Sequence, residues 1–331
     1  MLLFCFRALQ TSADMCYNID MYGREVIGRF APTPSGSMHV GNLLCAIVAY
    51  LSSKSKGGKF IIRIEDVDAP RCTRRAASDI LEMLEALGIK SDEPVVYQSE
   101  RAHAYCAAIR KIERAARVYP CFCTRAQLHA EGVTHLPDGG ALYSQKCKSL
   151  TREAAAELMR TETPSLRLSV PDEAIEFTDG IYGPQAQNLA RECGDFVIRR
   201  RDGIYAYQLA VVVDDGESGV TEVVRGADLL YDTPRQIYLQ RLLGLPTPDY
   251  FHIPLAVDAR GRKLSKSDGD SAALLLKRMP PREVIGALAC AVGLTDESRP
   301  VTLDELVPLY SPRKLSRDNI VLPRSLVSSD A

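Results

Sequence analysis

Residues 25–65 constrain the fold most, because they alternate strand and helix signals within one short stretch. Residues 25–31 (EVIGRFA) are a short apolar strand, which ends in a Pro- and Gly-rich turn at residues 32–36. Apolar residues then recur at helical spacing from Val40 to Leu51, and residues 59–65 (KFIIRIE) are a second strand. A strand, a helix and a strand over this length make a βαβ unit, whose crossover is nearly always right-handed. We therefore expect an α/β fold.

Composition limits the classes of protein that this chain can belong to. The 331 residues carry a formal net charge of −1, so any contact with nucleic acid must rest on local basic patches. No apolar run reaches roughly 18 residues, and we expect no membrane-spanning helix. The 10 cysteines are scattered apart from one group at residues 121–147, which indicates a cytoplasmic protein with reduced thiols. Residues 1–24 differ from the rest, and we expect a leader that is disordered or a mis-assigned start.

The middle of the chain carries weaker signals. Ser99 can cap a helix that runs to about Val118. Residues 119–150 are irregular and rich in Gly, Cys and polar residues, which is typical of an insertion. Residues 203–213 alternate or run apolar, and residues 214–219 (DDGESG) carry a turn signal.

The turn and the start of the first helix, residues 32–42 (PTPSGSMHVGN), have the features of a phosphate-binding site. Free backbone N–H groups at a helix start attract phosphate through hydrogen bonds and the helix dipole. Gly41 would let a nucleotide lie close to the backbone, and His39 would donate hydrogen bonds to a phosphate. The spacing matches neither the dinucleotide fingerprint nor the P-loop. A plain strand–helix turn capped by His39 is the alternative, and this motif alone does not decide between them.

A basic loop at residues 263–267 (KLSKS) follows a predicted strand at residues 251–257. Lys263 and Lys266 lie three residues apart on a small-residue segment, which could close over a triphosphate and neutralise charge on leaving pyrophosphate. Taken in isolation, such a loop is better explained as solvated surface charge.

The two motifs together resemble those of the class I aminoacyl-tRNA synthetases. Residues 39–42 (HVGN) are similar to their HIGH signature and residues 263–267 to their KMSKS signature, in the same order and at a fitting separation. The resemblance spans roughly residues 25–270, which makes chance similarity improbable. Six segments are similar to the glutamyl branch: residues 29–36 (RFAPTPSG), 63–68 (RIEDVD), 97–99 (YQS), 119–121 (YPC), 207–210 (YQLA) and 219–226 (GVTEVVRG).

This resemblance implies a Rossmann-type nucleotide-binding domain with an inserted connective segment that contains zinc, and a short helical C-terminal part. The stretch after Ser267 is too short for an anticodon-binding domain. The expected division is a leader at 1–24, the first half of the catalytic domain at 25–118, the insertion at 119–195, the second half of the catalytic domain at 196–245, and the KLSKS loop with a helical stem-contact region at 246–331.

A glutamate site needs a cation for the side-chain carboxylate and an acceptor for the ammonium group. Arginine binds carboxylates through paired hydrogen bonds, and Arg29 and Arg225 stand at the ends of predicted strands. Glu65 could hold the ammonium group, although Arg29 and Glu65 could simply pair with each other. The resemblance implies glutamate binding by Arg29, Phe30, Ala31, Pro32, Thr33, Glu65, Tyr207 and Arg225, ATP binding by His39, Gly41, Asn42 and Lys266, and catalysis by His39, Asn42, Lys263 and Lys266.

Cys121, Cys123 and Cys147 are the close group of cysteines and a candidate zinc site. Zinc takes four ligands, often thiolates, so a fourth ligand is needed. Three ordinary thiols on a loop are the alternative. Bottom-up reasoning leaves four residues open for the fourth position: Cys106, His129, His135 and Tyr143. The resemblance favours Tyr143, since Cys-x-Cys…Tyr-x-x-x-Cys is the pattern of one subfamily.

That pattern, the short C-terminal part and the run YQLAVVVDD at residues 207–215 resemble the glutamyl-queuosine tRNA(Asp) synthetase family. The resemblance implies tRNA-independent activation of L-glutamate with ATP and Mg²⁺, and transfer of glutamate to queuosine at the wobble position of tRNA(Asp). The alternatives are a truncated glutamyl-tRNA synthetase that charges acceptor ends, and a catalytically silent tRNA-binding paralogue. We expect a monomer, because nothing in the sequence indicates an obligate oligomer.

We predict that Lys266→Ala slows glutamate activation roughly 100-fold or more, because losing one donor to charge that develops in the transition state typically costs this much. Glutamate binding should weaken far less. The rate and the glutamate dependence of ATP–pyrophosphate exchange measure both quantities. Unchanged turnover in this variant would refute the assignment of the loop.

Overall fold

The computed structural model describes residues 24–128, 142–262, 264 and 271–327. Five residues named above, His129, His135, Lys263, Lys266 and Ser267, lie outside these ranges, as do residues 1–23. Within the described ranges, no helix is both long and apolar enough to cross a membrane.

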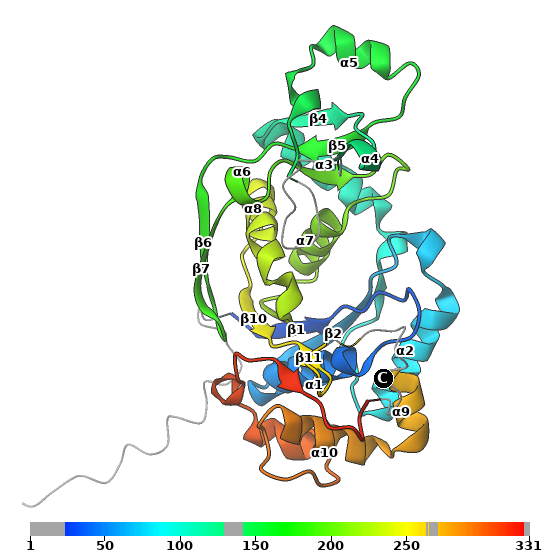
Figure 1. Ribbon diagram of the computed structural model, residues 1–331, viewed down its shortest axis with the longest axis vertical. Helices are drawn as coiled ribbons and strands as arrows, with labels where there is room; N and C mark the ends of the chain where they lie inside the picture. Colours follow the sequence, from blue (N-terminus) through cyan, green and yellow to red (C-terminus); the bar gives the residue numbers. More distant parts are fainter. Residues whose placement is uncertain (1–23, 129–141, 263, 265–270, 328–331) are drawn as a thin grey trace, which may run out of the picture.

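A seven-stranded sheet forms the centre of the molecule (Figure 1), in the order β3-β2-β1-β9-β10-β6-β7. Neighbouring strands are parallel, except that β6 and β7 form an antiparallel hairpin. The order reverses at β1, since the chain continues to β2 on one side and later returns to β9 on the other. α/β sheets bind ligands at such a switch point. The strands are β1 (Ile27–Phe30), β2 (Lys59–Ile64), β3 (Val96–Tyr97), β6 (Ala174–Asp179), β7 (Gly183–Asn188), β9 (Glu222–Gly226) and β10 (Asp249–Ile253).

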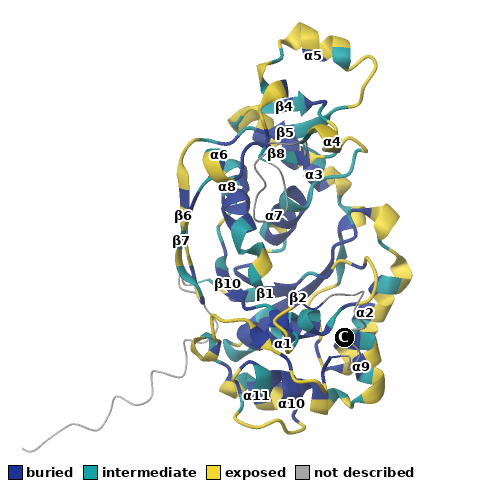
Figure 2. Ribbon diagram, in the orientation of Figure 1, coloured by how far each residue is buried: buried dark blue, intermediate teal, exposed yellow. Residues whose placement is uncertain are grey.

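Helices cover both faces of the sheet, and each face has its own apolar core (Figure 2). Side chains alternate between the faces of a strand, so Phe60 and Ile62 of β2 enter one core and Ile61 enters the other. The first core contains α1 (Val40–Ser55), α2 (Arg74–Ala86), α9 (Ala272–Arg278), α10 (Pro281–Ala291) and α11 (Leu303–Leu306). The second contains α3 (Ala102–Ala115), α7 (Tyr207–Glu217) and α8 (Thr233–Leu243).

The close approach of α1 to β1 requires a glycine. A Cβ atom on Gly28 would lie 1.9 Å from the hydroxyl oxygen of Ser53 in α1, well inside van der Waals contact. Gly28 therefore lets α1 pack directly on β1.

A second, three-stranded antiparallel sheet lies at the far end of the molecule, in the order β4-β5-β8. Its strands are β4 (Val118–Cys121), β5 (Ser165–Leu168) and β8 (Phe196–Arg199), and its short helices are α4 (Arg125–Leu128), α5 (Arg152–Leu158) and α6 (Leu189–Glu192). The β6–β7 hairpin runs from this part to the edge of the large sheet (Figure 1). A small parallel pair, β11 (Ala256–Val257) and β12 (Ile320–Val321), follows the main sheet.

Some local expectations from the sequence are wrong. The turn expected at residues 214–219 lies largely inside α7, because a buried apolar run carries too little periodicity to separate helix from strand. Ser99 does not cap α3, because the cap residue of this helix is Arg101. The Ser99 hydroxyl donates instead to the carboxylate of Asp66, over 2.7 Å. The strand expected at residues 251–257 is interrupted at Pro254, which lacks the N–H that a sheet ladder needs.

Candidate active site

A cavity of about 440 Å³ opens at the carboxyl ends of β1, β9 and β10, beside the first turn of α1. This is the switch point of the sheet, where the strand order reverses. The structure brings to this one cavity every described residue that the sequence assigned to glutamate or ATP: Arg29, Phe30, Ala31, Pro32, Thr33, His39, Gly41, Asn42, Glu65, Tyr207 and Arg225.

The carboxylate of Asp215 holds the side chain of Arg29 in place. The Arg29 side chain is 4% exposed, and its Nε lies 3.3 Å and 3.4 Å from the two carboxylate oxygens of Asp215 in α7. Its Nη1 donates to the carbonyl of Val224 over 3.2 Å. Within the described part of the chain, the remaining Nη2 has no protein partner and is available to the cavity.

Arg63 connects the same carboxylate to Glu65. It donates to Asp215 over 2.6 Å and to Glu65 over 3.2 Å, so Glu65 pairs with Arg63 and not with Arg29. Burial alone would raise the pKa of Asp215, but the charges of Arg29 and Arg63 hold it below its ordinary value. Burial raises the pKa of Glu65, and Arg63 and Arg29 only partly oppose this. The cavity floor thus contains fixed charges of both signs.

Arg225 sits in a hydrogen-bonded frame of its own. Its Nε donates to Nε2 of His252 over 2.9 Å, its Nη1 to Gln236 over 2.7 Å, and its Nη2 to Thr233 over 2.8 Å. Because arginine only donates, Nε2 of His252 must accept, and the ring proton is on Nδ1. Nδ1 then donates to Asp179 over 2.7 Å. Burial lowers the pKa of His252 to about 4, against the opposing effect of Asp179.

The first turn of α1, where the sequence predicts nucleotide binding, forms one end of the cavity. His39 is the residue that precedes this helix, and its backbone N–H donates to the side-chain oxygen of Asn42 over 3.1 Å. A Cβ atom on Gly41 would lie 3.0 Å from Nδ1 of His39, so a larger residue would displace the imidazole. Asn42 therefore fixes the helix start, and Gly41 makes room for the ring beside the cavity.

Several side chains at this site were missed by sequence reasoning. Arg63 and the adjacent Asp214 and Asp215 did carry a signal, since charged residues inside apolar elements must be paired when buried. Cys45 carried no such signal in the sequence. Burial raises its pKa to about 12, so the thiol is neutral where it lines the cavity. The other missed residues include Met38, Asp228 and His252.

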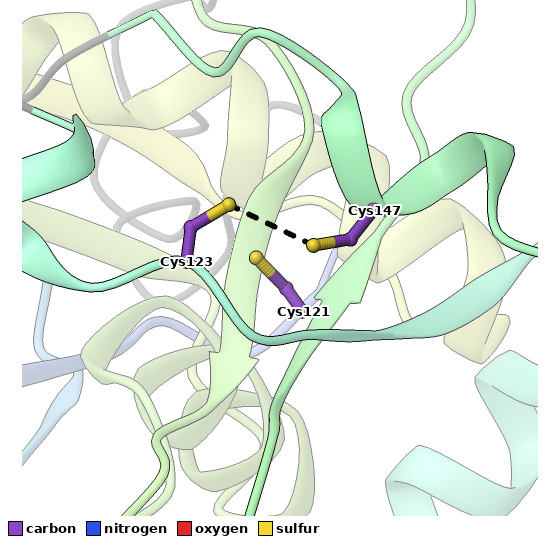
Figure 3. Close-up of side chains that lie close together, drawn as sticks. All are labelled: Cys121, Cys123 and Cys147. Carbon is purple, nitrogen blue, oxygen red and sulfur yellow. Dashed lines mark hydrogen bonds between the residues drawn. The ribbon is translucent and has the colours of Figure 1, made fainter. Parts of the chain in front are cut away.

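The predicted cysteine group also assembles (Figure 3). The sulfur atoms of Cys121, Cys123 and Cys147 all lie within 4.8 Å of one another, and those of Cys123 and Cys147 are 3.6 Å apart. Thiolates bound to one zinc at about 2.3 Å in a tetrahedron lie about 3.8 Å apart, which this arrangement approaches. The hydroxyl oxygen of Tyr143 lies 3.6 Å from the Cys121 sulfur. The donor set therefore fits zinc.

Arg167 supports this group and was not anticipated from the sequence. Its Nε donates to the sulfur of Cys121 over 3.3 Å, and its guanidinium lies 4.0 Å from the centre of the Tyr143 ring. Burial alone would raise the pKa of Cys121, but the hydrogen bonds with Tyr143 and Arg167 lower it to about 7. A thiolate is the form in which cysteine binds metals.

Comparison with known proteins identifies close relatives of this chain. A family model of the catalytic domain of class I tRNA synthetases (E and Q) matches residues 25–299. The Glutamyl-Q tRNA(Asp) synthetase of Cupriavidus metallidurans is 44% identical over 276 residues, which cover 83% of this chain and 86% of that protein. The proteins of the same name from Neisseria gonorrhoeae and Geobacter sulfurreducens are 50% identical over 239 residues (72% and 79% covered) and 46% identical over 279 residues (84% and 87% covered).

Two solved structures have the same fold. The glutamate-tRNA synthetase of Elizabethkingia anophelis superposes with a TM-score of 0.79 at 27% identity, over 90% of this chain and 68% of that chain. A glutamate tRNA ligase from Elizabethkingia meningosepticum, in complex with its amino acid, gives a TM-score of 0.78 at 27% identity, over 90% and 67% of the two chains.

The buried His252 predicts a loss of stability in mild acid. The unfolded chain binds a proton at this histidine near pH 6.5, whereas the folded chain does so only near pH 4. The unfolded state therefore binds more protons in this window, and the free energy of unfolding should fall as the pH drops from 6.5 towards 4, by at most about 3 kcal/mol. Urea unfolding at a series of pH values measures this slope.

A matched pair of variants isolates the effect. His252→Asn should be less stable at neutral pH and lose less stability between pH 6.5 and 4. His103→Asn, at an exposed position of α3, should keep the full slope. Equal slopes in the wild type and His252→Asn would contradict the prediction.

Proposed function

Because the chain belongs to the class I tRNA synthetases of the glutamyl and glutaminyl (E and Q) type, we propose that it activates L-glutamate with ATP, without tRNA, and transfers the glutamyl group to queuosine at the wobble position of tRNA(Asp). One observation carries the first half: a cavity at the switch point of the sheet has buried Arg29 and Arg225 together with buried Glu65. The second half rests on the relatives named Glutamyl-Q tRNA(Asp) synthetase.

In this proposal the two arginines have different tasks. Arg29 has a free Nη2 and binds the substrate side-chain carboxylate directly. Arg225 uses most of its five N–H groups inside its frame of His252, Gln236 and Thr233, so it supplies fixed positive charge and at most one further hydrogen bond.

Glu65 receives the ammonium group of glutamate. Its buried carboxyl has a raised pKa, and a cation beside it would favour the charged form. Tyr207 forms a wall of the cavity, and residues 30–33 (FAPT) at the end of β1 contact the amino acid with backbone and hydroxyl groups. The cavity would therefore recognise a zwitterion that carries a second carboxylate.

Activation joins glutamate to the α-phosphate of ATP. An oxygen of the α-carboxylate attacks the α-phosphorus in line, the bond from this phosphorus to the β-phosphate oxygen breaks, and pyrophosphate leaves. His39, beside Gly41 and Asn42, would donate to the phosphate oxygens as charge develops, and Lys263 and Lys266 would act on pyrophosphate. Magnesium, when bound with ATP, would neutralise part of the triphosphate charge.

The acceptor distinguishes this proposal from its rivals. A hydroxyl of the queuosine cyclopentene ring would attack the activated carbonyl and release AMP, in the cytoplasm and by a monomeric enzyme. The solved relatives named glutamate-tRNA synthetase or ligase favour a second candidate, a glutamyl-tRNA synthetase that charges acceptor ends. A silent paralogue is less consistent with the site, because it has no chemical need of His39, Arg29 and Glu65 together.

ATP–pyrophosphate exchange with single amino acids and no tRNA tests the proposal. We expect exchange with L-glutamate, and not with L-glutamine or L-aspartate, followed by transfer to tRNA(Asp) that carries queuosine but not to tRNA(Asp) that lacks it. Exchange that begins only when tRNA is added would support the second candidate, a glutamyl-tRNA synthetase that charges acceptor ends. No exchange under either condition would leave the silent paralogue.

We also propose that Cys121, Cys123, Tyr143 and Cys147 hold one zinc ion, which would fix the segment after β4 onto the small sheet. The purified wild type should contain about one zinc per chain by elemental analysis. Cys147→Ser should lose the metal, and Tyr143→Phe should lower zinc affinity tenfold or more. Cys290→Ser, on α10, is the control and should retain zinc. A folded, metal-free wild type with all thiols titratable would count against the site.

A further inference from the structure

Arg225 differs from the other buried arginines of the candidate site in the charge of its partners. Arg29 and Arg63 both donate to the carboxylate of Asp215. The groups that accept from Arg225 in the described part of the chain are instead an imidazole, a side-chain amide, a hydroxyl and a backbone carbonyl, which belong to His252, Gln236, Thr233 and Leu229. None of these four groups is a carboxylate that could cancel the positive charge of Arg225.

This neutral frame holds the guanidinium of Arg225 beside the cavity. Arg225 is 4% exposed and lines the cavity, and a buried cation is costly unless an anion completes its surroundings. Because arginine only donates, every partner in the frame must accept. The amide of Gln236 is turned accordingly, since its Oε1 accepts from Arg225 and its Nε2 donates to Gln208 over 2.8 Å. The frame therefore fixes the position of the charge and leaves the charge itself to a ligand.

His252 accepts from Arg225 in only one of its two neutral tautomers. Its Nε2 is free to accept when the ring proton is on Nδ1. Nδ1 lies 2.7 Å from Oδ2 of Asp179, and an ionised carboxylate only accepts. Burial alone would raise the pKa of Asp179, but hydrogen bonds from His252 and from the backbone hold it below its ordinary value. Asp179 therefore keeps the ring in the tautomer that accepts from Arg225.

Backbone groups fix the carboxylate of Asp179 in turn. Its side chain is buried, and its Oδ1 accepts from the backbone N–H groups of Ile181 and Tyr182, over 2.9 Å and 2.8 Å. Its Oδ2 accepts from the backbone N–H of His252 over 3.1 Å, in addition to the ring. The turn after β6 thus sets the orientation of the carboxylate independently of the imidazole that it directs.

We propose that Asp179 and His252 are positioning residues for the amino-acid substrate: Asp179 sets the tautomer of His252, His252 holds Arg225, and Arg225 offers its positive charge to a carboxylate of glutamate. Asp179 and His252 act through Arg225, because neither of them lines the cavity. The inference rests on the proposed function for its substrate. It adds two residues, from β6 and β10, that lie behind the amino-acid and ATP site.

Two substitutions of His252 separate its two hydrogen bonds. Asparagine places its amide near the former Nδ1, so His252→Asn can still contact Asp179 but has no acceptor near Arg225. Glutamine reaches the former Nε2, so His252→Gln keeps an acceptor for Arg225. In ATP–pyrophosphate exchange without RNA, the KM for L-glutamate should rise about tenfold or more in His252→Asn and less than threefold in His252→Gln. The kcat should change little, because binding that is equal in the ground and transition states affects KM alone.

Asp179→Asn tests the control of the tautomer. The asparagine oxygen should face the backbone N–H groups of Ile181 and Tyr182, which turns its NH2 group towards the ring. Nδ1 of His252 must then accept, the ring proton moves to Nε2, and two donors oppose each other at Arg225. The KM for glutamate should rise roughly tenfold. In the His252→Gln background, which has no ring, the same substitution should change KM less than threefold.

A merely structural role would give another pattern. If Asp179 only supports the turn after β6, Asp179→Asn should change KM equally in both backgrounds, and this result would overturn the proposal. Equal KM values in His252→Asn and His252→Gln would also overturn it, whether or not Asp179→Asn folds. The matched control is Tyr250→Phe, which keeps the ring stacked 6.0 Å from that of His252 and loses only a hydroxyl bonded to Gln240. Its KM should change less than twofold, and melting temperatures report stability separately.

The tautomer can also be measured without any substrate. The chain has 5 histidines, and NMR of protein labelled with 15N-histidine distinguishes protonated from unprotonated ring nitrogens, with His252→Gln as the assignment control. We expect the proton on Nδ1 in the wild type and on Nε2 in Asp179→Asn. A wild type with the proton on Nε2 would refute the proposal.

Failure of the proposed function gives a different result. If the wild type does not exchange with glutamate, the activation step fails, and equilibrium dialysis of labelled glutamate replaces the kinetics. A Kd at least fivefold weaker in His252→Asn than in His252→Gln then supports the positioning roles. Equal Kd values, or no binding of glutamate to the wild type, refute them.

Discussion

The carboxylate of Asp215, shared by two buried arginines, is the interaction on which the candidate active site depends. It joins α7 to Arg29 on β1 and Arg63 on β2, so three elements meet at one charged group. Buried ion pairs contribute little net stability, because desolvating the charges offsets most of their attraction. What the cluster provides is position: it holds Arg29 with one nitrogen left over for a ligand, and it holds Glu65 through Arg63.

The sequence predicted which residues line the site better than it predicted how they are held. Arg29, Glu65 and Arg225 could be assigned because the carboxyl ends of parallel strands converge at one edge of a sheet, so the end of each strand is informative. Asp215 could not, because it lies 186 positions from Arg29 and inside a run whose two aspartates, glycines and serine looked like a turn. His252 was also missed, since a histidine in a strand gives no sign of which nitrogen will accept from Arg225.

The cysteine group shows the same division. Short spacing predicted that Cys121 and Cys123 would lie together, and Cys147 and Tyr143 do approach them. Arg167 comes from β5 and was not foreseen, because antiparallel pairing of β4 with β5 brings it beside Cys121 and no local pattern encodes that register. The basic loop at residues 263–267 lies largely outside the described residues, so the predicted roles of Lys263 and Lys266 stay predictions.

Asp179 is the last residue of β6, and it also fixes the tautomer of His252, which in turn accepts from Arg225. The β6–β7 hairpin is thus linked to Arg225, a charged group of the candidate site, through two hydrogen bonds. Any ligand that displaces the end of β6 would therefore also disturb Arg225 and change the electric field in the candidate site. Thermodynamic reciprocity then requires that a molecule bound in the candidate site alter the affinity for that ligand by the same factor. Such a connection would couple the position of the hairpin to whether the candidate site is filled.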